Sequence, residues 1–88
     1  MEAKVNNLTS NKGNVIANQF EIRTDKARFF QSYNSIIVKI ENGQTYLDSY
    51  YYNYSKTTSK YRNIFLGEST KEIESKITNG EYILTNLN

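Results

Sequence analysis

The chain has 88 residues, a formal net charge of +2, and neither cysteine nor histidine. This length predicts one domain with one modest core. The missing residue types exclude disulfides, thiol chemistry, zinc sites built from cysteine or histidine, and catalytic triads that use a histidine base.

The first third of the chain predicts an arm followed by two strands. Residues 1–13 are polar and have no sustained apolar period, so we expect a flexible N-terminal arm there and a single folded domain over residues 14–88. Alternating apolar residues predict a strand within residues 14–24. A turn at Thr24-Asp25-Lys26 and a second strand from Phe29 follow.

Residues 35–52 predict a β-hairpin. Asn42-Gly43 is the strongest short hairpin signal, because a tight turn of this kind needs positive φ at both central residues. This turn would pair Glu41 with Gln44 and Lys39 with Tyr46. One face of the hairpin is predicted to join the core, and it carries Ile36, Val38, Ile40, Thr45, Leu47 and Ser49. The other face is predicted to be partly solvated, and it carries Lys39, Tyr46, Asp48, Tyr50 and Tyr52.

Two short helices and a strand are predicted after the hairpin. The first helix, over residues 55–66, has Ser55 as its N-cap and Gly67 after its end, and its buried stripe would consist of Tyr61, Ile64 and Phe65. The second helix, over residues 70–79, begins with a capping box between Ser69 and Glu72 and would bury Ile73 and Ile77. A closing strand is expected over residues 82–87.

Together these elements predict an α+β fold. We expect a small antiparallel sheet with the hairpin 35–52 at its centre and both helices on one face. The short connection between the helices also allows a helix-turn-helix arrangement.

Candidate catalytic groups are scarce. Asp25 and Asp48 are the only aspartates, and no glycine-rich loop suitable for phosphates is present. For Asp48 we favour a solvated carboxylate over a magnesium ligand, since no second acid is placed to converge with it. The sequence therefore predicts no enzyme, no cofactor and no metal site.

The clearest functional signal is a cluster of tyrosines followed by basic residues. Seven of the eight tyrosines lie between Tyr33 and Tyr61. Tyrosine suits protein interfaces and stacking on unpaired bases, but it also has high β propensity, and we assign Tyr46 and Tyr51 to the sheet on that ground. The basic residues equally fit a solvated helix face. The candidate residues for contact with a nucleic acid or another partner are Tyr50, Tyr52, Tyr54, Lys56, Lys60 and Arg62.

Four segments form a pattern: Phe30-Gln-Ser-Tyr33, Ile37-Val-Lys-Ile40, Tyr46-Leu47 and residues 54–66. This pattern, over about residues 29–79, resembles that of small proteins encoded by phages and plasmids of low-GC Gram-positive bacteria. Its most specific part is the Tyr-Ser-x-Thr-Thr segment that leads to Phe65-Leu66. The resemblance implies a mobile genetic element as the setting and assigns no catalytic residue. Small proteins in that setting are commonly DNA-binding accessory factors or inhibitors of host defence, including anti-CRISPR proteins.

Two non-enzymatic functions therefore stay open. The first is a nucleic-acid-binding accessory or regulatory factor, and the second is an anti-defence inhibitor that binds a host protein. A homodimer is also allowed, for example through an edge strand at Tyr82–Leu87. Because no apolar run approaches the ~20 residues of a membrane span, we expect a protein of the host cytoplasm with no membrane partner.

Overall fold

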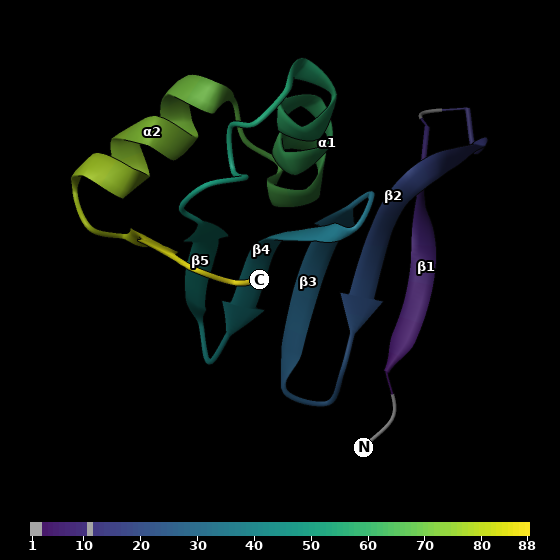
Figure 1. Ribbon diagram of the computed structural model, residues 1–88, viewed down its shortest axis with the longest axis horizontal. Coiled ribbons are helices and arrows are strands. Elements are labelled where there is room, and N and C mark those ends of the chain that lie inside the picture. The colour runs from purple at the N-terminus through teal and green to yellow at the C-terminus, as the bar shows by residue number, and fades with distance from the viewer. Residues whose placement is uncertain (1–2, 11) are drawn as a thin grey trace.

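The protein forms one six-stranded sheet with two helices on the same side of it (Figure 1). The computed structural model describes residues 3–10 and 12–88. In chain order the elements are β1 (Lys4–Thr9), β2 (Val15–Arg23), β3 (Ala27–Ser32), β4 (Ser35–Glu41), β5 (Gln44–Asp48), α1 (Lys56–Leu66), α2 (Thr70–Thr78) and β6 (Tyr82–Thr85). The α+β fold class is therefore confirmed.

The order of the strands in the sheet follows their order in the chain. Neighbours from β1 to β5 are antiparallel, whereas β6 runs parallel to β5 at the edge. A parallel neighbour needs a crossover connection, and the α1–α2 segment supplies it. The closing strand was predicted, but its parallel direction makes the sheet mixed rather than antiparallel.

The prediction of a flexible arm is wrong for the described part of residues 1–13. Lys4–Thr9 pair with β2 as an edge strand, with Val5 opposite Ile22 and a bulge between Asn7 and Thr9. Most side chains of β1 are exposed, so the strand lacks the apolar alternation that marks a half-buried one. Backbone pairing with β2 and the packing of Leu8 against the core hold it in place. Residues 1, 2 and 11 of the predicted arm lie outside the described residues.

The central hairpin has the predicted turn and pairing. Asn42 and Gly43 have φ angles of 53° and 75°, and Glu41 and Lys39 lie opposite Gln44 and Tyr46. The regular hairpin ends at Asp48 rather than near residue 52, because the chain turns there toward α1.

A bulge in β4 changes which isoleucine enters the core. Phe30 pairs with Val38 and Gln31 pairs with Ile36, so Ile37 has no partner on β3. An extra residue of this kind interrupts the alternation of side chains. Ile37 and Val38 are consequently both buried, whereas Ile36, which was expected in the core, is half-buried.

The core lies between the sheet and the helices. Phe30, Val38 and Leu47 from neighbouring strands pack with Ile37 and with Ile73 of α2. The rings of Phe30 and Phe65 stack with centroids 5.7 Å apart, which places α1 against β3. Tyr61 and Phe65 join the core as expected, but Ile64 is 53 % exposed and does not belong to the buried stripe.

Candidate contact surface at the tyrosine loop

The segment between β5 and α1, residues 49–55, carries four tyrosines and is called the tyrosine loop here. Asp48 fixes its first half. One carboxylate oxygen of Asp48 accepts the N–H groups of Tyr50 at 3.1 Å and Tyr51 at 2.8 Å, and the other accepts the N–H of Leu87 at 2.8 Å. The Ser49 N–H also donates to the Thr85 carbonyl at 2.8 Å. The loop is thus tied to the C-terminal end of the chain.

Asp48 is buried, so its interpretation as a solvated carboxylate is wrong. Burial alone would raise the pKa of Asp48, but the backbone donors of Leu87, Tyr51 and Tyr50 and the Asn88 side chain outweigh it and lower the pKa. A carboxylate that accepts several N–H bonds acts here as a structural anchor. The sequence alone gave no signal for this role, because Leu87 is 39 residues away.

Two of the loop tyrosines are exposed side by side. Tyr50 and Tyr54 are 68 % and 63 % exposed, and their ring centroids lie 5.9 Å apart. Tyr51 is half-buried behind them and meets both rings edge-on, at 4.7 Å from Tyr50 and 5.4 Å from Tyr54. Because Tyr51 already holds the two flat rings in place, their side chains lose little conformational entropy when a partner binds.

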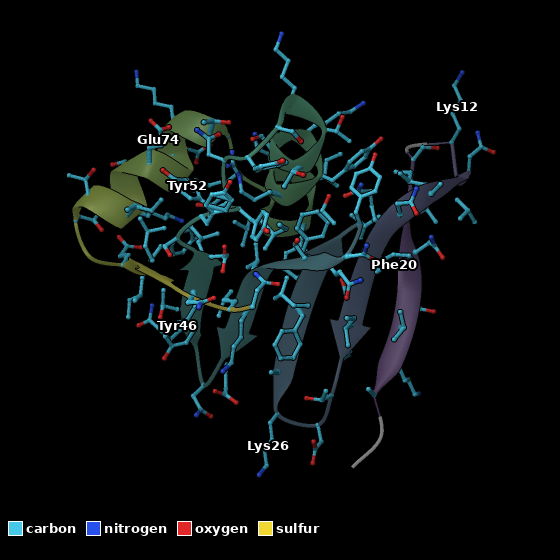
Figure 2. The ribbon with its side chains drawn as sticks, in the orientation of Figure 1. Lys12, Phe20, Lys26, Tyr46, Tyr52 and Glu74 are labelled. Carbon is cyan, nitrogen blue, oxygen red and sulfur yellow. The ribbon has the colours of Figure 1, made fainter. Side chains whose placement is uncertain are left out.

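Tyr52 points the other way. It is half-buried, packs against the core, and lines a pocket on α2 with Glu74, Ile77 and Thr78. Figure 2 shows Tyr52 on the side of the molecule that carries Glu74 of α2. Of the three tyrosines proposed as contacts, the structure therefore brings Tyr50 and Tyr54 together and assigns Tyr52 to the interior between the loop and α2.

Arg62 is fully buried and cannot contact a partner, so its prediction as a contact residue is wrong. Its guanidinium donates to the Tyr52 carbonyl at 2.6 Å, to Asn63 Oδ1 at 2.8 Å and to Thr70 Oγ1 at 3.0 Å. Burial lowers the pKa of Arg62. These bonds connect the tyrosine loop, α1 and the first turn of α2. Arg62 was placed at the surface by residue type, although it lies one helical turn after Thr58, which is also buried.

Lys56 and Lys60 are exposed on α1, as predicted. Helix α1 carries no acidic residue, and no ion pair found among residues 3–10 and 12–88 involves either lysine. The ammonium of Lys60 lies 5.3 Å from the Tyr61 ring centroid. With Ser55 as N-cap directly after Tyr54, the helix begins beside the exposed ring pair. The contact surface that remains consists of Tyr50, Tyr54, Lys56 and Lys60.

A second basic cluster does not extend this surface. Arg23 and Arg28 both pair with Glu21, at 2.8 and 3.0 Å, and Arg28 also covers the Phe65 ring. Burial would raise the pKa of Glu21, but the two arginines outweigh it and lower the pKa. Lys26 lies at the end of the sheet far from the helices (Figure 2).

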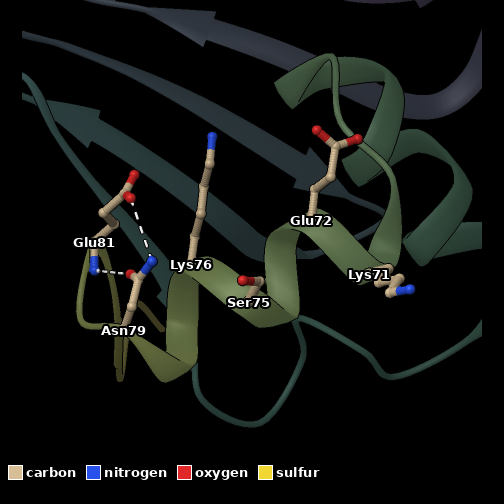
Figure 3. Close-up of a pocket in the computed structure, with 6 residues that line it drawn as sticks. All are labelled: Lys71, Glu72, Ser75, Lys76, Asn79 and Glu81. Carbon is tan, nitrogen blue, oxygen red and sulfur yellow. Dashed lines mark hydrogen bonds between the residues drawn. The ribbon is translucent and has the colours of Figure 1, made fainter.

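A hollow beside α2 carries no catalytic arrangement. It measures about 370 Å³ and is lined by Lys71, Glu72, Ser75, Lys76, Asn79 and Glu81 (Figure 3). Its polar groups are used locally: Glu72 closes the capping box with Ser69, and Asn79 bonds to Glu81. Among the described residues no group of three or more acidic side chains is placed to hold a metal ion.

None of the helices in the described part of the chain combines the length and apolar character needed to cross a membrane.

Comparison with known proteins identifies a family. No curated protein and no solved structure matches the chain. A family model does match, over residues 3–81, which is most of the chain. The chain therefore belongs to a family of unknown function, DUF8033.

Proposed function

We propose that the protein is a small, non-enzymatic nucleic-acid-binding factor of a mobile genetic element, with an accessory or regulatory role. The observation that carries this proposal is the exposed pair of rings, Tyr50 and Tyr54, directly before an acid-free helix with two exposed lysines. Exposed aromatic rings stack on unpaired bases, and lysines neutralise the backbone phosphates. The ligand class that fits best is a single strand.

The setting in a mobile element is supported by the resemblance over about residues 29–79. The size of the surface limits the role. Two rings and two lysines would contact only a few nucleotides, which suits an accessory factor that acts beside other proteins.

Binding of a fluorescently labelled single-stranded oligonucleotide, followed by anisotropy, tests the proposal. We expect Lys56→Glu with Lys60→Glu, and separately Tyr50→Ala with Tyr54→Ala, to weaken binding at least ~10-fold. The matched control is Lys12→Glu with Lys71→Glu, which makes the same charge change at exposed positions outside the surface. Equal affinity of the wild type and both surface variants would refute the proposal.

A second candidate function, an inhibitor of host defence that binds a protein, is supported by the same exposed tyrosine pair, because tyrosines often anchor protein interfaces. The two functions differ in the lysines. A protein target captured from host lysate by the wild type and by Lys56→Glu with Lys60→Glu, but not by Tyr50→Ala with Tyr54→Ala, would favour inhibition.

A further inference from the structure

The side of the sheet away from the helices carries a row of six side chains, one from each strand, and all but the lysine on β4 are apolar or aromatic. The Phe30 side chain faces α1, so its neighbour Phe29 points to the opposite side. Residues that pair with Phe29 across neighbouring strands lie on the same side of the sheet, and this pairing can be followed from Phe29 to both edges. The row consists of Val5, Ile22, Phe29, Lys39, Tyr46 and Ile83. A second, shorter row beside it consists of Asn7, Phe20, Gln31 and Ile36.

These two rows form what we call the open face. Neither helix covers it, because both lie on the Phe30 side (Figure 1). Large apolar side chains consequently stay in contact with water, and at the two edges Val5 and Ile83 are 58 % and 40 % exposed. Contiguous apolar surface of this extent marks an interaction site.

The charge of the open face indicates what covers it. Lys39, in the first row, and Glu41, beside it on β4, pair with each other at 3.2 Å, and by alternation the acidic Asp48 lies on this side of β5 next to Tyr46. The face therefore has no excess positive charge to hold phosphates, which argues against a nucleic acid. The same pair is self-complementary: across a two-fold axis, the lysine of each copy can meet the glutamate of the other, as a symmetric interface requires.

The size of the face also fits a second copy. Six strands spaced ~4.8 Å apart, with about five residues at ~3.3 Å along each strand, give the face a flat area on the order of 500 Å². The accessible area is larger, because side chains project from this plane. This is the order of the ~800 Å² that each partner of a standard interface buries. Two sheets packed face to face at ~10 Å form a familiar architecture.

We propose that two copies of the chain pack through their open faces, sheet against sheet, around a two-fold axis. The helices and tyrosine loops then lie on the outer layers of the dimer. This inference is independent of nucleic-acid binding, because it uses the opposite side of the sheet.

Light scattering coupled to size exclusion, without nucleic acid, tests the proposal through charge reversal. We expect the wild type to have the mass of two chains at ~100 μM, a concentration that exceeds typical dimer dissociation constants. Lys39→Glu alone and Glu41→Lys alone should each be monomers, because like charges then face each other. An equimolar mixture of the two variants should regain the mass of two chains. A monomeric wild type, or single variants that stay dimeric, would overturn the proposal.

Spin labels provide a test that does not rely on destabilising the interface, since the chain has no native cysteine. Labels on Gln31→Cys, on the open face, should lie within ~20 Å of each other across the dimer, whereas labels on Lys71→Cys, on α2, should lie more than ~35 Å apart, given ~10 Å between packed layers. The reverse order of distances would show that the dimer uses another surface. A monomer in which Phe29→Ala abolishes oligonucleotide binding would assign the open face to nucleic acid instead.

Discussion

Arg62 shows how a single basic residue can serve the architecture rather than a partner. Its planar guanidinium reaches three oxygens from three segments, and none of them is a carboxylate. A lysine has neither the planar shape nor the number of donors to replace these bonds. The positive charge of Arg62 is therefore stabilised by neutral oxygen acceptors. A substitution that displaces the guanidinium leaves these buried oxygens without hydrogen-bond donors.

We expect Arg62→Lys to lower the free energy of unfolding by ~2–4 kcal/mol, because it breaks a buried hydrogen-bonded cation. Urea denaturation followed by circular dichroism measures this change. The control is Lys60→Ala, on the exposed side of the same helix, which should stay within ~0.5 kcal/mol of the wild type. An unchanged urea midpoint for Arg62→Lys would contradict the structural role of the residue.

Asp48 makes stability depend on pH in the acid range. Its pKa is lower in the folded state than the ordinary value of 3.8, so the unfolded chain binds more protons at acid pH. The stabilisation is complete above pH 3.8 and is lost as the pH falls through the lower folded-state pKa.

We therefore expect Asp48→Asn to be less stable than the wild type by ~1–2 kcal/mol at neutral pH, and the difference to shrink as the pH is lowered from ~6 toward ~2. Urea titrations at several pH values measure both quantities. Asp25→Asn, at an exposed turn position, is the control and should leave neutral-pH stability within ~0.5 kcal/mol of the wild type. A difference that grows on acidification would contradict the assignment.

Strand β1 is the element whose place in the fold depends most on long-range pairing. Its backbone bonds to β2, the Asn7 side chain donates to the Ile16 carbonyl at 3.0 Å, and Leu8 packs against the core. We expect Leu8→Ala to cost ~1–2 kcal/mol in thermal or urea unfolding, through lost apolar burial. Asn6→Ala, exposed on the same strand, should cost less than ~0.5 kcal/mol. Equal stability of both variants and the wild type would mean that β1 behaves as the loose arm first expected.

The elements that could be predicted from the sequence are those specified by adjacent residues. The Asn42-Gly43 turn and the Ser69–Glu72 capping box are determined within four residues, and the structure contains both. The bulge at Ile37 depends on how β3 pairs with β4, and the parallel direction of β6 depends on the crossover. Arg62 depends on acceptors in other segments. Of the candidate site, the exposed tyrosine pair and two lysines were predicted, whereas the distinction between Tyr50 and Tyr52 required the anchor at Asp48.

At the scale of the whole molecule, the contact surface at the tyrosine loop and the open face lie on opposite sides. One sheet and one layer of helices separate them. The crossover through α1 and α2 places the tyrosine loop on the helical side, while the open face lies on the other side. Substitutions on one surface should consequently leave the other intact. This separation permits a dimer that presents a nucleic-acid contact on each outer layer.

The salt dependence of binding distinguishes the contributions of the lysines and the rings. Each phosphate contact to a single strand contributes ~0.7 to the slope of log affinity against log salt concentration, so Lys56→Ala with Lys60→Ala should reduce the slope by ~1.4. Tyr50→Ala with Tyr54→Ala should leave the slope unchanged and remove ~1–3 kcal/mol per lost base stack at every salt concentration. Anisotropy titrations between ~50 and ~200 mM salt measure both effects. If the tyrosine variant changed the slope and the lysine variant did not, the lysines would not contact phosphates, and the proposed division of roles on this surface would be wrong.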